Sequence, residues 1–113
     1  MNLTTETSKD IIIVRVKETR LIYPLLSYFL ETVTKNIETG KRKILIDLSQ
    51  VSYVDSATMG CFMDLYRQTD NVGGVLKLSG VTSRVKTMFS MTGAHNFIEL
   101  YSDEASALES FKV

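Results

Sequence analysis

The sequence has very little cysteine, proline, histidine or tryptophan: one Cys, one Pro, one His and no Trp in 113 residues. A single cysteine cannot form an internal disulfide, and one thiol falls far short of a zinc site. No apolar run approaches the roughly 20 residues that cross a bilayer. The first ten residues lack the basic start and apolar stretch of a signal peptide. We therefore expect a cytoplasmic protein with no direct membrane insertion.

Neither sign of charge dominates, because thirteen Lys and Arg residues balance thirteen Asp and Glu residues. This balance argues against a nucleic acid partner held by bulk electrostatics. The chain is 44% hydrophobic and 23% charged, which are ordinary globular values and exclude disordered and fibrous classes. With no linker, internal repeat or low-complexity tract, residues 1–113 are expected to form one domain.

Short β-branched or apolar runs alternate with amphipathic helical patterns along the chain. The expected strands are residues 2–8, 11–16, 44–48, 75–78 and 97–101. The expected helices are one opened by Pro24 and ended by Gly40, and three more near residues 58–71, 83–91 and 103–111. This alternation predicts an α/β fold with largely parallel strand pairing and right-handed crossovers.

The segment most informative about function runs from Ile44 to Gly60. A strand expected to be buried leads through a short loop to Asp55 and Ser56, just before a helix expected to begin near Thr58. Ser56 has two interpretations. It is either a helix cap, as small polar residues often are, or an exposed hydroxyl at the positive end of a helix. A phosphate at that position would gain from backbone N–H groups.

The same segment resembles the signature of STAS domains, the sulphate-transporter and anti-sigma-factor-antagonist domains of bacteria. The resemblance rests on Val54-Asp-Ser-Ala-Thr-Met-Gly60 after Ile44-Leu-Ile-Asp-Leu48, and it continues through Gly73-Gly74 and residues 83–93 into the last helix. It implies the STAS fold, an α/β fold with a small, mixed, mostly parallel sheet and about four helices packed chiefly on one face. The length of 113 residues is similar to that of free-standing antagonists rather than transporter tails.

The resemblance also implies a function. In that family the unmodified antagonist binds an anti-sigma factor, which is also a serine kinase of the histidine-kinase-like ATPase type, and so frees the sigma factor. Phosphorylation of the serine that matches Ser56 ends binding, and a PP2C-type phosphatase reverses it. The implied protein is not an enzyme, needs no cofactor or metal, and is a monomer or weak dimer. The implied partner surface comprises Arg20, Tyr23, Asp55, Ser56, Ala57, Thr58 and Met59.

Two departures from the family pattern are visible. The Gly-x-Leu-Asp turn that often follows the second strand is replaced by Lys17-Glu-Thr-Arg-Leu21. Thr58 replaces a common glycine, where it would cap the helix or act as a second phosphoacceptor. Two other functions are compatible with the fold: an accessory subunit of a lipid-transport ATP-binding cassette system, and a scaffold subunit of a stress-sensing complex.

Asp47 and Asp55 suggest a receiver domain phosphorylated on aspartate, which would need an acidic Mg²⁺ cluster and a lysine at strand ends. No adjacent acidic pair follows an early strand, and Lys77 alternates with leucines and is expected to face solvent. Arg15 is likewise expected on a solvated strand face. This pattern disfavours a receiver.

Two further residues have reactive side chains. His95 is expected to be a solvated turn residue, because no Gly-x-Ser-x-Gly motif accompanies it. Cys61 lies in the second long helix and is expected to be a packing residue rather than a reactive thiol, because no basic neighbour in the sequence lowers its pKa.

Overall fold

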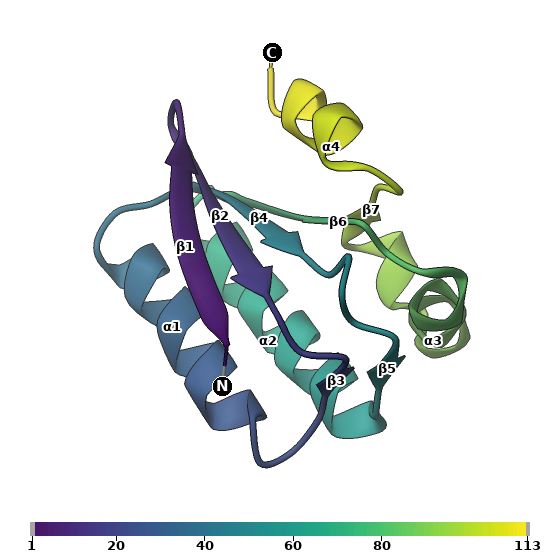
Figure 1. The fold of residues 1–113 in the computed structure, drawn as a ribbon. Coiled ribbons are helices and arrows are strands. Elements are labelled where there is room, and N and C mark those ends of the chain that lie inside the picture. The colour runs from purple at the N-terminus through teal and green to yellow at the C-terminus, as the bar shows by residue number, and fades with distance from the viewer. Residues whose placement is uncertain (1, 113) are drawn as a thin grey trace.

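The computed structural model describes residues 2–112, which form seven strands, four α-helices and one 3₁₀ helix (Figure 1). In chain order the elements are β1 (Leu3–Ser8), β2 (Ile11–Val16), β3 (Arg20–Leu21), α1 (Leu26–Glu38), β4 (Lys43–Asp47), β5 (Tyr53–Val54), α2 (Ser56–Asn71), β6 (Val75–Ser79), α3 (Ser83–Thr92), the 3₁₀ helix η1 (Ala94–Asn96), β7 (Glu99–Leu100) and α4 (Glu104–Ser110).

Five of the strands form one mixed sheet in the order β1-β2-β4-β6-β7. β1 is an edge strand that pairs antiparallel with β2, and the other neighbours pair parallel. β3 and β5 form a separate parallel pair. Parallel neighbours need a crossover, and α1 and α2 supply it between β2, β4 and β6. The predicted α/β fold with a mixed, mostly parallel sheet is confirmed.

Successive strand residues point to opposite faces of the sheet, and this alternation divides the core in two. Ile12 and Val14 belong to the larger cluster, which also contains the buried faces of α1, α2 and α3. Ile11 and Ile13 belong to a smaller cluster with Ala107 and Phe111 around α4. Figure 1 shows α1 and α2 below the sheet and α4 above it. The helices therefore lie chiefly on one face.

Three phenylalanines join the helices of the larger cluster. The Phe62 ring centroid lies 5.4 Å from that of Phe29 and 5.4 Å from that of Phe89. All three side chains are fully buried. Tilted or edge-on aromatic pairs at this spacing add to the stabilisation from apolar burial. This contact fixes α2, the helix that carries the functional segment, between α1 and α3.

Some predicted element ends differ from the structure. Pro24 does not open a helix: the Leu25 N–H donates to the Ile22 carbonyl in a separate turn, and α1 begins at Leu26. The last strand is shorter than predicted, because the N–H groups of Phe97 and Ile98 both donate to the Ala94 carbonyl. These bonds continue the turn after η1, so only two residues remain to pair with β6.

The predicted solvent exposure of Lys77 is wrong. Its side chain is buried, and Nζ donates to the Ser110 carbonyl at 3.0 Å and to Ser110 Oγ at 2.9 Å. Nζ also lies 4.9 Å from the centroid of the Phe111 ring. The alternation along β6 is as expected, but α4 covers the second face of the sheet.

Arg15 also differs from its predicted solvated position. Its guanidinium is largely covered and pairs with Asp47 at 2.8 Å, with Glu6 at 2.9 Å and with Glu104. These partners lie on β4, β1 and the start of α4. The ion pairs therefore join both ends of the chain to the middle of the sheet.

Candidate functional site

The start of α2 is defined by Asp55, which is the N-cap residue. Asp55 has an extended backbone, and its Oδ1 accepts a hydrogen bond of 2.9 Å from the Thr58 N–H. Ser56 is the first residue of the helix, which begins two residues earlier than predicted. The alternative in which Ser56 or Thr58 caps the helix is therefore wrong, and the Ser56 side chain is exposed.

Thr58 is the anchor of this helix end. Its side chain is fully buried, and Oγ1 lies 2.6 Å from the Leu21 carbonyl oxygen and 2.8 Å from Asp55 Oδ1. Both atoms are acceptors, so the single hydroxyl proton is shared between them. The Leu21 bond ties β3 to the first turn of α2. Because it is buried, the Thr58 hydroxyl is not accessible as a second phosphoacceptor.

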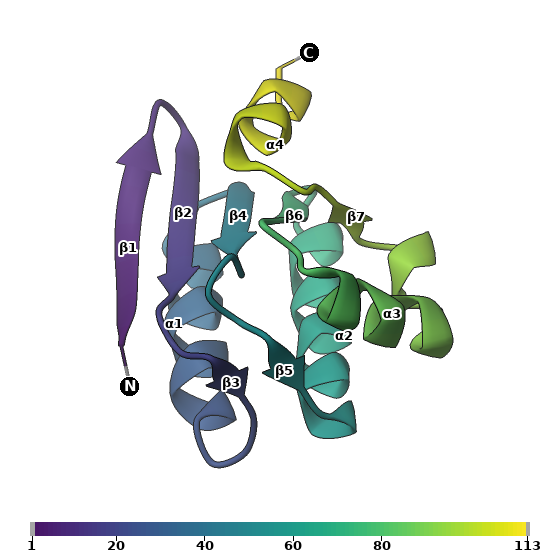
Figure 2. The same ribbon diagram turned by 45° about the vertical axis from the view of Figure 1, so that its right-hand side comes forward.

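The pairing of β3 with β5 brings a distant loop to the same place. Arg20 lies opposite Tyr53 in this pair, and its guanidinium carbon is 5.1 Å from the Tyr53 ring centroid. The Thr19 carbonyl accepts hydrogen bonds from the Ser52 N–H at 2.8 Å and the Tyr53 N–H at 3.2 Å. Figure 2 shows β3 and β5 side by side, next to the start of α2. The pairing therefore brings β3 next to the segment that leads into Ser56.

The predicted partner residues divide by exposure. Arg20, Tyr23, Ser56 and Ala57 are exposed, Asp55 is half-buried, and Thr58 and Met59 are buried. Met59 packs into the larger core cluster. The side chains of Thr58 and Met59 thus support the surface from beneath instead of forming it.

The structure adds Tyr53, which the sequence reasoning missed. Its side chain is 40% exposed, whereas the next residue, Val54, is buried. An aromatic residue that alternates with a buried valine just before the Asp55-Ser56 pair was the available signal. Tyr23 is 73% exposed. Tyr53, Tyr23 and Arg20 give the surface beside Ser56 two aromatic side chains and a guanidinium, and we call these three residues with Ser56 and Ala57 the Ser56 surface.

The carboxyl group of Asp55 is held in its charged form. Partial burial opposes ionisation, but the hydrogen bonds from the Thr58 N–H and hydroxyl outweigh it and lower the pKa of Asp55 below its usual value. A negative charge at a helix N-terminus is also favoured by the helix dipole. A fixed negative charge therefore precedes the Ser56 hydroxyl in the chain.

The other chemically notable residues lie elsewhere. Asp47 pairs with Arg15 and accepts from the Ser49 N–H, and residues 2–112 hold no cluster of three or more His, Cys, Asp or Glu side chains suited to a metal ion. Burial, with the nearby carboxylates, raises the pKa of the Cys61 thiol, which packs against the larger cluster. His95 is exposed in η1. Within residues 2–112, no helix combines the length and apolar character needed to cross a membrane.

Comparison with known proteins identifies the family. The sequence profile of the STAS domain matches residues 2–107. The chain belongs to the STAS domain family. Among curated relatives, a Thermotoga neapolitana homologue of TM1081, named as a candidate anti-sigma factor antagonist, is 30% identical over 73 residues, which is 65% of each chain. The anti-sigma-B factor antagonist of Bacillus subtilis is 34% identical over 55 residues, 49% of this STAS chain and 50% of that protein.

Solved structures have the same fold. The crystal structure of the candidate anti-sigma factor antagonist TM1081 from Thermotoga maritima is 21% identical, with a TM-score of 0.87 over 96% of this chain and 92% of that chain. The Bacillus cell fate determinant SpoIIAA in its phosphorylated form is 16% identical, with a TM-score of 0.76 over 98% of this chain and 100% of that chain. The STAS fold of this chain is thus confirmed.

Proposed function

We propose that this STAS protein is an anti-sigma factor antagonist that is switched off by phosphorylation of Ser56. Its partner is an anti-sigma factor that is also a serine kinase, and a PP2C-type phosphatase restores the unmodified form. The protein acts by binding and catalyses no reaction. The names of the curated relatives support the antagonist role, and a solved structure with the same fold is of a phosphorylated protein.

The observation that carries the proposal is the position of Ser56. Its side chain is exposed at the first residue of a long helix, while the hydroxyls of Ser52 and Thr58 are both engaged with backbone carbonyls. A phosphate on Ser56 would lie at the N-terminus of α2, where the helix dipole favours an anion. The fold can therefore accept the modification without rearranging.

A phosphate on Ser56 would act by weakening the binding of the partner. Phosphorylation adds a charge of about −1.5 to −2 at pH 7, which would follow the ionised Asp55 directly. A partner that packs against a neutral hydroxyl would then have to desolvate this charge. Arg20 and Tyr53 lie on the paired strands β3 and β5 next to the start of α2, and Arg and Tyr residues often dominate binding energy at protein interfaces. Phosphorylation of Ser56 would therefore lower the affinity of the partner for the Ser56 surface.

The test compares Ser56→Asp and Ser56→Ala with the unmodified protein, using the anti-sigma factor isolated from the same cells. Ser56→Asp should weaken binding about tenfold or more, which is a loss of about 1.4 kcal/mol. Ser56→Ala should bind like the unmodified protein and take up no phosphate. Ser83→Asp is the matched control, because Ser83 is also exposed and is the first residue of α3 after a capping Thr82.

Two results would contradict the proposal. One is unchanged binding by Ser56→Asp, measured by calorimetry on the purified pair. The other is an unmodified Ser56 in mass spectra of the protein from its own cells across growth and stress conditions. Co-purification with a transporter ATPase or with a large multi-subunit particle would then favour the accessory or scaffold function.

A further inference from the structure

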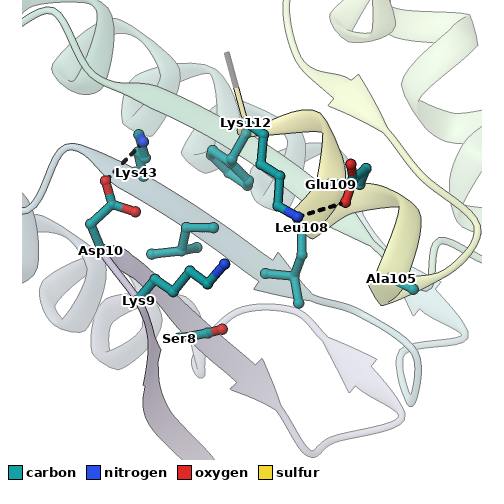
Figure 3. A pocket seen from close by; sticks show the side chains of 10 residues that line it. Ser8, Lys9, Asp10, Lys43, Ala105, Leu108, Glu109 and Lys112 are labelled. Carbon is teal, nitrogen blue, oxygen red and sulfur yellow. Dashed lines mark ion pairs between the residues drawn. The ribbon is translucent and has the colours of Figure 1, made fainter.

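A pocket of about 270 Å³ lies at the end of the sheet remote from Ser56. It is bounded by the turn between β1 and β2 on one side and by α4 on the other (Figure 3). The start of α2, with β3 and β5, lies at the opposite end of the sheet (Figure 1). The pocket is therefore separate from the Ser56 surface, and its role does not depend on the proposed function.

The lining between the sheet and α4 is apolar and firmly held. Ile11 of β2 and Phe111 at the end of α4 line the pocket, and both belong to the smaller core cluster. Leu108 of α4 packs against the same cluster and completes the lining. Ile11 and Phe111 are themselves only 6% and 5% exposed, so the apolar surface that a hydrocarbon chain would remove from water lies mainly on the half-buried Leu108 and the exposed Ala105.

The rim of the pocket carries more positive than negative charge. Lys43 pairs with Asp10 at 2.8 Å, and Lys112 pairs with Glu109 at 3.0 Å. Lys9 is the third lysine of the rim and forms no ion pair with any residue between 2 and 112. Figure 3 shows the Lys9 side chain extending across the opening toward Leu108. One ammonium group is thus left to receive an anion beside the apolar lining.

The backbone of Lys9 supports a role for its side chain. Lys9 has a φ of 57°, in the left-handed region, and it is the one residue other than glycine with positive φ among residues 2–112. Glycine and asparagine fit that conformation better than lysine does. A lysine at this turn is therefore not explained by the needs of the backbone.

We propose that this pocket binds a medium-chain carboxylate, with the alkyl chain on Ile11, Leu108 and Phe111 and the carboxylate at Lys9. A pocket of about 270 Å³ is just below the roughly 300–1,000 Å³ typical of small-molecule sites, which suits a small ligand of about ten non-hydrogen atoms. Octanoate has this size and is the probe for the test.

The experiment titrates the intact protein with sodium octanoate and follows backbone amide shifts by NMR. Saturable shifts confined to residues 8–11, 43 and 105–112 are expected. Lys9→Asn should weaken octanoate binding about threefold to fivefold, as for loss of an exposed ion pair. The same variant should melt no lower than the unmodified protein, because asparagine suits the turn. Lys35→Gln removes one positive charge from the exposed face of α1 and is the matched control.

Two further ligands and one blocking variant complete the test. Octan-1-ol should bind more weakly than octanoate, and acetate should not bind at all. Ala105→Phe places a ring in the pocket from an exposed position on α4 and should abolish octanoate binding. The proposal is overturned if octanoate shifts other residues or none, if octan-1-ol binds as well as octanoate, or if Lys9→Asn and Lys35→Gln have equal effects.

Discussion

The buried hydroxyl of Thr58 donates to the Leu21 carbonyl across a distance of 2.6 Å, and this contact joins two parts of the chain that are far apart in sequence. Leu21 ends β3, and Thr58 lies in the first turn of α2. The contact therefore holds β3, which carries Arg20, against the first turn of α2. In the sequence the same threonine replaces a glycine common in the family, and the structure gives it a positioning role.

Replacing Thr58 with valine should destabilise the protein by about 1–3 kcal/mol, because valine keeps the shape but leaves a buried carbonyl without its donor. Thr69→Val is the matched control: Thr69 is equally buried, but its hydroxyl bonds only to the carbonyls of Leu65 and Tyr66 in its own helix. The control should cost about 1 kcal/mol or less. Urea unfolding of both variants measures the difference, and equal costs would contradict the positioning role.

The contribution of Asp55 to stability should depend on pH. Its pKa is lowered in the folded protein, so its charged form stabilises the fold above the unfolded pKa of about 3.9 and this contribution is lost as pH falls through the folded pKa. Asp55→Asn retains a good cap but no charge. The difference in unfolding free energy between the two proteins should be largest near neutral pH and shrink below about pH 4. Chemical unfolding at a series of pH values measures it, and parallel curves would argue against this assignment.

Lys77 should control the docking of α4. Lys77→Ala removes both hydrogen bonds to Ser110 and leaves a void beneath Phe111, so we expect a loss of about 1–3 kcal/mol. Lys77→Met retains most of the side-chain volume and should cost less. Hydrogen exchange should be faster in α4 of Lys77→Ala, while the start of α2 keeps its protection. Unchanged exchange in α4 would show that the lysine does not hold this helix.

Gly80 and Gly60 should respond to alanine in opposite directions. Gly80 has a φ of 67°, and an added Cβ would lie 2.7 Å from Ser49 Cβ and 2.9 Å from the Ser49 nitrogen. Gly80→Ala should therefore destabilise the protein by about 1–3 kcal/mol. Gly60 lies in α2 with no atom within 4 Å of an added Cβ, so Gly60→Ala should stabilise by about 0.5–1 kcal/mol. Thermal unfolding of the two variants checks both signs.

Much of the fold could be predicted because its signals are local. The apolar run at residues 44–48 was predicted to be a strand covered on both faces, and Ile44 and Leu45 do face different clusters. The glycines after the predicted helices also lie where those helices end: Gly40, Gly73 and Gly93 all have positive φ. Periodicity and backbone preference act over a few residues, so these features can be read directly from the chain.

The errors have a common cause. Lys77 and Arg15 were placed in solvent because a strand pattern shows which residues share a face, but not whether another element covers that face. The sequence itself predicts that Met59 packs in the core, since it lies three residues before Phe62 and so shares its helix face. The burial of Lys77 and Arg15, in contrast, depends on how α4 and β1 pack around the sheet.

The candidate site also has a part that the local sequence predicts and a part that depends on long-range packing. Asp55-Ser56 at the start of a helix could be found from capping preference and from the family resemblance, because both depend on adjacent residues. The position of Arg20 over Tyr53, and the burial of Thr58 between Leu21 and Asp55, arise from pairing between β3 and β5. That pairing joins segments separated by α1 and β4, and no local pattern encodes it. The chain therefore specifies the serine and its helix, whereas long-range packing decides which side chains surround them.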